Sequence, residues 1–292
     1  MLSYFQAVIM GLLQGVSELF PVSSLGHSVL FPSLFGWGNL VRAQSDPESF
    51  FLAFLVGLHV ATAIALIIFY RQEWGRIILG FFSSFKKGQA TTPDERLAWL
   101  LIVATIPAGL VGVFFEHSLR MLFAKPLAAS LFMVVNGAVL WLVEILRRRP
   151  DESRSDRSLE STAKNLGIMK YRDAALIGVS QILALFAGIS RSGITIVGGL
   201  LRGLDHQDAA RFSFLLATPI ILAAGVYKVP DLFGPNGDGV RAQIAVGSLA
   251  AGLAAYFAVR FLDRFFRKRR LTPFAIYCVV FGAGMALRLL LF

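Results

Sequence analysis

Residues 14–27 have the sequence QGVSELFPVSSLGH, and residues 188–193 have the sequence GISRSG. Each polar cluster interrupts an apolar segment near its centre, the first at 3–34 and the second at 173–204. The arm after each interruption has ten to twelve residues, which as a helix cover about 15–18 Å, roughly half of a hydrocarbon core. We therefore predict two re-entrant helical hairpins whose tips stop inside the membrane, where irregular backbone must be enclosed by protein or water.

The composition of the chain indicates that its solvent is lipid. Of 292 residues, 56% are hydrophobic and only 16% are charged, whereas a soluble domain carries about 25% charged residues. Crossing a bilayer takes roughly 20 apolar residues, and six further segments qualify: 49–70, 96–115, 126–147, 211–229, 241–263 and 272–292. We predict an all-α integral membrane protein with six transmembrane helices plus the two re-entrant hairpins. No signal peptide is expected, because the N-terminus lacks a basic region.

The two interrupted segments also resemble each other. With an offset of 167 residues, Ser23 falls on Ser190 and Gly26 on Gly193. Each half of the chain then continues with three predicted spans. We accordingly predict an internal repeat, with repeat 1 at about 1–147, a solvated linker at 148–172 and repeat 2 at about 173–292.

Loop charge predicts the orientation of the spans. The stretches 71–95, 147–172 and 264–271 hold 17 Lys/Arg in all. The stretches 33–48, 117–125 and 228–240 hold 4. Because cytoplasmic loops are enriched in Lys/Arg, we place the first set in the cytoplasm, which makes the two halves inverted and lets the hairpin tips meet near the midplane. The same bias explains the net charge of +10, and no nucleic acid is expected as a partner, since no RNA-binding motif accompanies it.

Polar side chains gather at both hairpin tips. They are Gln14, Ser17, Glu18, Ser23, Ser24 and His27 in the first and Ser190, Arg191, Ser192 and Thr195 in the second. Placing a charged side chain at the depth of the bilayer core costs about 2.5–3.5 kcal/mol of insertion free energy. The presence of Glu18 and Arg191 there therefore requires a structural or functional explanation. One explanation is a buried ion pair that only pins the hairpins together. We favour a functional site, because hydroxyls, an imidazole and glycines accompany both charges.

These groups suit a phosphate ligand. Helix N-termini offer free amides to anions, and Gly26 and Gly193 begin the second arm of each hairpin. Arg191 can bind two phosphate oxygens in parallel. Ser24 and His27, spaced i and i+3, share a helix face and form the pattern of an activated nucleophile. The alternative for His27 is a capping or core histidine.

Several other polar residues have plainer explanations. Ser17 and Ser23 suit close helix packing in a membrane as well as they suit a site. Gln14 and Glu18, one helical turn apart, could hold a divalent cation or a water molecule. His59 lies within a span and is expected to bond to a neighbour. Three residues are expected to lie elsewhere: His117 and His206 in loops, and Glu144 near the cytoplasmic end of a span, paired with the arginines at 147–149.

The two clusters, extended to GISRSGITIVGGLLRG at 188–203, resemble the two signature motifs of bacterial undecaprenyl-pyrophosphate phosphatases, the bacitracin-resistance family. The similarity continues in TIPAGLVG at 105–112, FSFLLATP at 212–219 and TPFAIY at 272–277, and so covers nearly the whole chain. It implies a multi-pass enzyme of the bacterial cytoplasmic (inner) membrane, with its site accessible from the periplasm. The implied reaction removes the terminal phosphate of undecaprenyl pyrophosphate, recycling the lipid carrier for cell-wall polymers and conferring bacitracin resistance.

The resemblance also assigns residues. The family's acidic pair falls on Gln14 and Glu18, its serine pair on Ser23 and Ser24, its histidine on His27 and its arginine on Arg191. Many members carry Glu where this chain has Gln14, so Glu18 takes more of any metal-binding role. The resemblance implies a divalent cation, Mg²⁺ or Ca²⁺, and no organic cofactor. The expected partners are the polyprenyl pyrophosphate and membrane lipids, with a homodimer as the candidate assembly.

Our mechanistic hypothesis is cleavage of the P–O–P bond. Arg191, Ser190 and the tip amides hold the pyrophosphate, and Ser24 attacks the terminal phosphorus while His27 or Glu18 takes its proton. Direct attack by water, with Glu18 as base, stays open. The rival function is a polyprenyl-phosphate flippase, which would use the same phosphate clamp. The expected catalytic residues are Ser24, His27, Glu18 and Arg191, and the expected substrate-binding residues are Gln14, Ser23, Gly26, Ser190, Ser192, Gly193 and Thr195.

Overall fold

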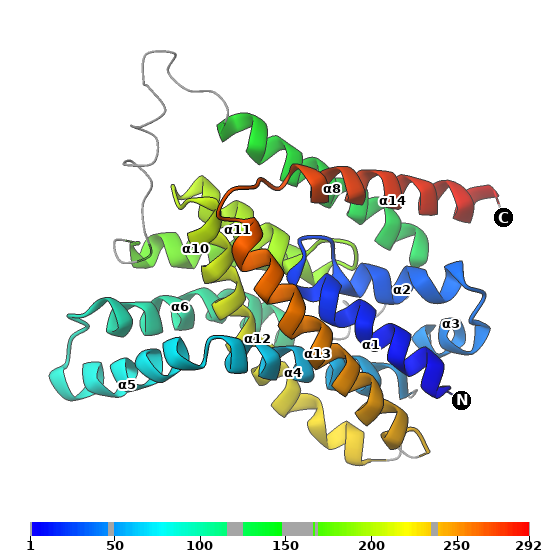
Figure 1. Ribbon diagram of the computed structural model, residues 1–292, viewed down its shortest axis with the longest axis horizontal. Helices are drawn as coiled ribbons and strands as arrows, with labels where there is room; N and C mark the ends of the chain where they lie inside the picture. The colour runs from blue at the N-terminus through cyan, green and yellow to red at the C-terminus, as the bar shows by residue number, and fades with distance from the viewer. Residues whose placement is uncertain are drawn as a thin grey trace.

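The computed structural model describes residues 2–45, 50–115, 125–147, 166, 169–234 and 239–291, and every regular element within them is helical (Figure 1). The helices of the first half are α1 (Tyr4–Leu19), α2 (Ser24–Leu34), α3 (Gly38–Ser45), α4 (Phe50–Phe69), α5 (Arg71–Lys87), α6 (Pro93–Phe114) and α8 (Pro126–Arg147). Those of the second half are α10 (Tyr171–Gln181), the short 3₁₀ helix η2 (Ile182–Leu185), α11 (Arg191–Leu201), α12 (His206–Phe233), α13 (Arg241–Phe265) and α14 (Thr272–Leu291).

Six of these helices are long and apolar enough to cross a membrane, which confirms the predicted number of spans among the described residues. They are α4, α6, α8, α12, α13 and α14. The largest differences from prediction are at helix starts. Helix α6 begins at Pro93 because Thr92 and Glu95 form a capping box around its first turn. Helix α12 begins at His206, where the carboxylate of Asp205 accepts the amide of Asp208 at 2.7 Å.

Both interrupted segments break into two helices at the predicted polar clusters. Helix α1 ends at Leu19 and α2 begins at Ser24, whereas α10 and η2 precede α11, which begins at Arg191. Ser23 and Ser190 are the N-caps, since their hydroxyls accept the amides of Gly26 and Gly193 at 3.2 and 3.1 Å. The breaks therefore have local causes. The re-entrant course of the hairpins and the inversion of the repeats stay predictions.

Helices of one half pack mainly against helices of the other half. Helix α1 packs on α13, and α10, its counterpart in the second half, packs on α6. Likewise α4 packs on α12, and α8 lies antiparallel beside α14 (Figure 1). Each first arm of a hairpin thus contacts the second span of the other half. The second arms pack on their own half, α2 on α8 and α11 on α12, so each hairpin is held by spans of both halves.

Part of the loop prediction was wrong. The stretch 71–95, expected to be a loop, contains the 17-residue helix α5, which packs beside α6 (Figure 1). The charged residues at both ends of α5 made the segment look like a loop. Its inward-facing residues, Ile77, Gly80 and Ser84, nevertheless follow the spacing of a helix. A short helix, α3, likewise occupies part of 33–48. Of the predicted linker, residues 148–165, 167 and 168 lie outside the described residues, as do 117–124 of the predicted loop at 117–125.

Glycines allow the two hairpin tips to meet. Gly188 has φ +107°, a conformation that side chains rarely adopt, and a Cβ there would lie 2.3 Å from the carbonyl oxygen of Ala129 on α8. A Cβ on Gly26 would lie 3.0 Å from the Cα of Gly188. The backbones of the first tip, the second tip and α8 therefore meet with no room for a methyl group.

We expect Gly188→Ala to destabilise the protein, because the strained backbone alone costs about 1–3 kcal/mol and the added methyl group must displace α8. Thermal unfolding in detergent measures the effect. Gly112→Ala is the matched control, since a Cβ there meets nothing within 4 Å. Equal unfolding temperatures for the two variants would contradict the close contact of the tips.

Candidate active site

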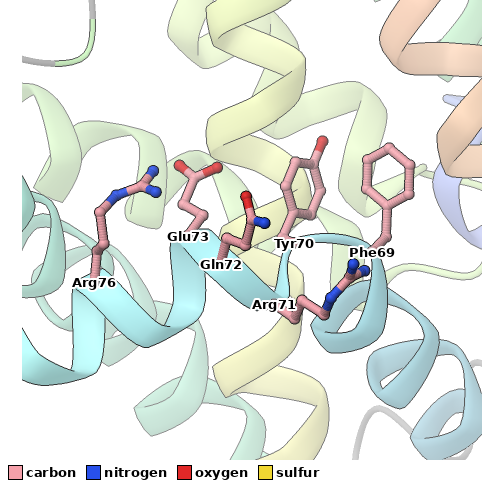
Figure 2. Close-up of a pocket in the computed structure, with 6 residues that line it drawn as sticks. All are labelled: Phe69, Tyr70, Arg71, Gln72, Glu73 and Arg76. Atoms are coloured by element: carbon pink, nitrogen blue, oxygen red, sulfur yellow. The ribbon is translucent and has the colours of Figure 1, made fainter.

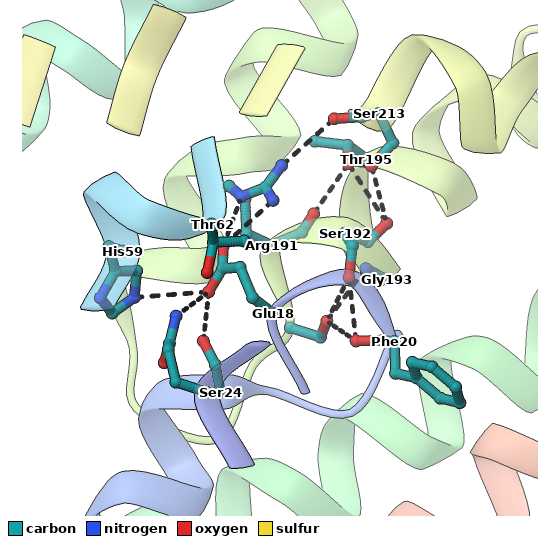
Figure 3. Close-up of polar contacts among 12 residues, drawn as sticks. Glu18, Phe20, Ser24, His59, Thr62, Arg191, Ser192, Gly193, Thr195 and Ser213 are labelled. Carbon is teal, nitrogen blue, oxygen red and sulfur yellow. Dashed lines mark hydrogen bonds and ion pairs between the residues drawn. The ribbon is translucent and has the colours of Figure 1, made fainter. Parts of the chain in front are cut away.

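The carboxylate of Glu18, in the last turn of α1, is the centre of the polar cluster (Figure 3). Its Oε1 accepts from Nε and Nη2 of Arg191 at 3.2 and 3.1 Å. Its Oε2 accepts from Nε2 of Gln14 at 3.1 Å and from the hydroxyl of Ser24, and it lies 3.3 Å from Nε2 of His59. Four donors from four helices therefore surround one buried carboxylate.

The chain folds back sharply between Glu18 and Ser24. Ser23 makes this turn possible with φ +70°, and it is the only residue other than glycine with a positive φ among those described. Its hydroxyl accepts the amide of Gly26 and also, at 3.2 Å, the amide of Gly188 from the second hairpin. The strained residue is thus fixed by its own helix and by the opposite tip, and it presents Ser24 to the carboxylate.

Arg191 supplies the positive charge from the second hairpin. It is the first residue of α11, and its side chain is 12% exposed. Besides its two contacts with Glu18, it donates Nη1 to the carbonyl oxygen of Ser213 at 3.2 Å. A guanidinium has five N–H donors, so two remain beyond these three bonds for a ligand.

Asn136 on α8 joins the two tips. Its Nδ2 donates to the carbonyl oxygen of Pro21 in the first tip at 3.0 Å, and its Oδ1 accepts the amide of Ser190 in the second at 3.0 Å. Sequence reasoning gave this residue no role. An amide in an apolar span was the available signal, because a buried polar group in a membrane requires partners.

The hydroxyls of the second tip form a separate polar cluster (Figure 3). Ser192 donates to the carbonyl oxygen of Phe20 at 3.0 Å, its hydroxyl lies 3.0 Å from that of Ser190, and Thr195 contacts Ser213 at 2.7 Å. These hydroxyls bind protein groups and join the hairpins. That Ser190, Ser192, Gly193 and Thr195 also contact a substrate stays a prediction.

His27 does not pair with Ser24. Its Nδ1 lies 2.7 Å from the carbonyl oxygen of Ser23 and its Nε2 lies 2.7 Å from the hydroxyl of Tyr277. Its ring also stacks on those of Tyr277 and Phe281. Both ring nitrogens are therefore occupied, and the expected serine–imidazole contact is corrected: of the two bases considered for Ser24, only Glu18 touches its hydroxyl.

His59 is the site residue that sequence reasoning undervalued. It was expected to bond to a neighbour, and Nδ1 does lie 2.7 Å from the carbonyl oxygen of Leu55 one turn earlier. Its other nitrogen reaches Glu18 across the helix interface. The signal was an imidazole in the most apolar of the six spans.

Of two expectations away from the site, the one for His206 was wrong, and the one for Glu144 falls partly on residues outside those described. His206 begins α12 instead of lying in a loop, and its Nε2 lies 2.7 Å from Oε1 of Glu144. Glu144 also accepts the amide of Leu271 at 2.8 Å, whereas Arg147 donates to the carbonyl oxygen of Leu204 at 2.7 Å. Among the described residues, Glu144 thus binds across helices and not to Arg147; the other two expected partners, residues 148 and 149, lie outside them. The remaining histidine, at 117, lies outside the described residues.

The donors around Glu18 do not fit a protein-held divalent cation. Mg²⁺ and Ca²⁺ are bound by carboxylate and carbonyl oxygens, but both oxygens of Glu18 already contact protein donors, Oε1 from Arg191 and Oε2 from Gln14, Ser24 and His59. Gln14 turns its N–H toward the carboxylate. No group of three or more His, Cys, Asp or Glu side chains able to hold a metal occurs in the part of the chain that the structure describes.

The cluster is nearly closed. The exposed fractions of Glu18 and Ser24 are 6% and 7%, whereas the side chain of His59 is 26% exposed. A pocket of about 270 Å³ lies elsewhere, at the junction of α4 and α5, and is lined by Phe69, Tyr70, Arg71, Gln72, Glu73 and Arg76 (Figure 2). None of the expected site residues lines it, and its Glu73 is bound by Arg211 at 2.6 Å. Of the side chains around Glu18, that of His59 is the more exposed.

Comparison with known proteins identifies relatives along nearly the whole chain. The model of the family described as "Bacitracin resistance protein BacA" matches residues 7–284. The chain is 54% identical to the undecaprenyl-diphosphatase of Mycolicibacterium paratuberculosis, over 97% of this chain and 96% of that protein. It is 48% identical to undecaprenyl-diphosphatase 2 of Frankia alni, over 98% of both chains.

We expect Asn136→Leu to destabilise the protein by about 1–3 kcal/mol, because it removes the partner of the Ser190 amide and leaves the Pro21 carbonyl with only a weak bond from the Cys278 thiol. Thermal unfolding in detergent measures the change. Thr105→Val is the control, because the Thr105 hydroxyl donates only to Leu101 of its own helix. An Asn136 variant as stable as this control would show that the amide does not hold the tips together.

Proposed function

The chain belongs to the bacitracin resistance protein BacA family, and on this basis we propose that it hydrolyses undecaprenyl pyrophosphate to undecaprenyl phosphate and inorganic phosphate. Such a reaction recycles the lipid carrier of cell-wall polymers and accounts for bacitracin resistance. The observation that carries the proposal is the contact of the Ser24 hydroxyl with Glu18, whose carboxylate is bound by Arg191 from the opposite hairpin. A nucleophile, a base and a phosphate-binding group thus meet at one point.

Binding begins at Arg191. Its two remaining N–H groups donate to oxygens of the terminal phosphate, and its bonds to Glu18 and Ser213 keep the guanidinium plane fixed. Phosphoryl transfer depends mainly on positioning and on neutralising charge. A guanidinium already held by the protein loses little freedom when the substrate arrives.

In the first chemical step, Glu18 accepts the proton of Ser24 as its Oγ attacks the terminal phosphorus. The bond from that phosphorus to the bridging oxygen breaks. The lipid leaves as its monophosphate, with the bridging oxygen and the electron pair of the broken bond. The terminal phosphoryl group remains on Ser24 as a phosphoserine, and the proton on Glu18 passes to the departing phosphate.

In the second step, water attacks the phosphoserine and gives a proton to Glu18. The bond between phosphorus and the serine oxygen breaks, inorganic phosphate leaves, and Ser24 recovers its proton. One water is consumed and the site returns to its starting state. Glu18 acts as the base in both steps because it is the carboxylate in contact with Ser24.

We expect Ser24→Ala to lower the rate of phosphate release by about 10⁴-fold or more, the scale of losing a nucleophile, with binding of a non-hydrolysable farnesyl diphosphate analogue retained. The assay measures phosphate released from farnesyl or undecaprenyl pyrophosphate by protein in detergent. Ser17→Ala is the matched control, since the Ser17 hydroxyl donates only within α1.

A loss of only a few-fold in Ser24→Ala would contradict the serine nucleophile and favour attack by water, with Glu18 as base. No phosphate release by the unaltered protein under any condition, together with movement of polyprenyl phosphate across vesicles, would contradict the hydrolase and favour a flippase.

We also propose that the protein lies in the bacterial inner membrane and that its substrate enters from the periplasm, because the loop charge places 33–48 outside and 71–95 inside. In whole cells, a membrane-impermeant maleimide should label Gly38→Cys and not Gln89→Cys. The native Cys278 is fully buried and gives little background. The reverse labelling pattern would overturn the orientation.

A further inference from the structure

Both ring nitrogens of His59 face hydrogen-bond acceptors at this site. Nδ1 faces the carbonyl oxygen of Leu55 at 2.7 Å, and Nε2 faces the Glu18 carboxylate at 3.3 Å. Both partners are acceptors, so each ring nitrogen must carry a proton to satisfy them. The ring is then an imidazolium, held between its own helix and α1.

The charges of the cluster do not cancel. Glu18 contributes one negative charge, whereas Arg191 and His59 contribute two positive charges, which leaves one positive charge for a ligand. A diphosphate monoester carries at least two negative charges near neutral pH. A site that binds it without metal needs such an excess.

Gln14 accounts for the difference from a two-carboxylate site. It occupies the position one turn before Glu18, and its amide N–H donates to that carboxylate at 3.1 Å. A second carboxylate in this place would face the first at hydrogen-bond distance, and the like charges would repel unless a proton or a cation lay between them. With Gln14 present, the carboxylate is satisfied by protein donors alone.

His59 is also the more exposed of the side chains that contact Glu18. Its side chain is 26% exposed, more than those of Glu18 and Arg191. The Oε1 atom of Gln14 is buried and has no partner in the structure. A cationic edge and an unused acceptor therefore flank the carboxylate.

We propose that His59 is a positioning residue that takes the place of a divalent cation: its imidazolium holds the Glu18 carboxylate against Ser24 and supplies positive charge for the diphosphate. This inference rests on the proposed hydrolase function. In this inference, Gln14 and His59 together hold the Glu18 carboxylate and supply positive charge. In a site with two carboxylates, a metal ion would have these roles. The chain accordingly turns over substrate without added Mg²⁺ or Ca²⁺.

The test is phosphate release from farnesyl pyrophosphate by detergent-solubilised protein, in EDTA and in millimolar Mg²⁺. The unaltered protein should keep its rate in EDTA. His59→Gln keeps a donor toward Glu18 and loses the charge, and in EDTA it should be slower by about 100-fold, the loss typical of one preorganised group. Mg²⁺ should restore most of this loss. Gln14→Glu should require Mg²⁺ outright.

His206→Gln is the matched control, because it removes a second imidazole–carboxylate contact, with Glu144, away from the site. Its rate should respond to EDTA as the unaltered protein's does. A second readout needs no turnover: titration calorimetry should detect Mg²⁺ binding to Gln14→Glu and none to the substrate-free unaltered protein.

Loss of the unaltered protein's activity in EDTA, or an equal effect of EDTA on it and on His59→Gln, would overturn this inference and leave the hydrolase intact. Absence of phosphate release by the unaltered protein in both EDTA and Mg²⁺ would instead overturn the proposed function itself.

Discussion

The ion pair between Glu18 and Arg191 is the constraint on which the rest of the structure depends. Removing two charges from water costs several kcal/mol each, and the cost is recovered only when further hydrogen bonds satisfy both groups. Here the carboxylate takes donors from α1, α2, α4 and α11, and the guanidinium also binds a backbone carbonyl on α12. The pair therefore fixes where five helices can lie.

The scaffold around this pair leaves the tips little freedom. Asn136 binds the backbone of both tips, and the hydroxyl of Ser23 caps its own helix while accepting an amide from the other hairpin. Gly188 allows the backbones to touch. Because the first arm of each hairpin packs on a span of the other half, the positions of the two tips are coupled, and the reacting groups are positioned before substrate binds.

The same geometry divides the polar residues into two groups. Ser24, His59 and Gln14 face the carboxylate, whereas His27 is held by Tyr277 and by the backbone of Ser23. The hydroxyls of the second tip likewise bind Phe20 and Ser213. His27, which is near Ser24 in the sequence, thus has a structural role. His59, from a distant span, is the histidine that contacts the Glu18 carboxylate.

Sequence alone determined the six spans and the two breaks, because span length and apolar composition are properties of a few consecutive residues. It also placed Gln14 beside Glu18, since a spacing of four fixes neighbours within one helix. Only the tertiary structure decided that Ser24 donates to Glu18, that His59 reaches the site and that Asn136 joins the tips. Those contacts depend on which helices pack together and at what rotation, and no spacing along the chain specifies that.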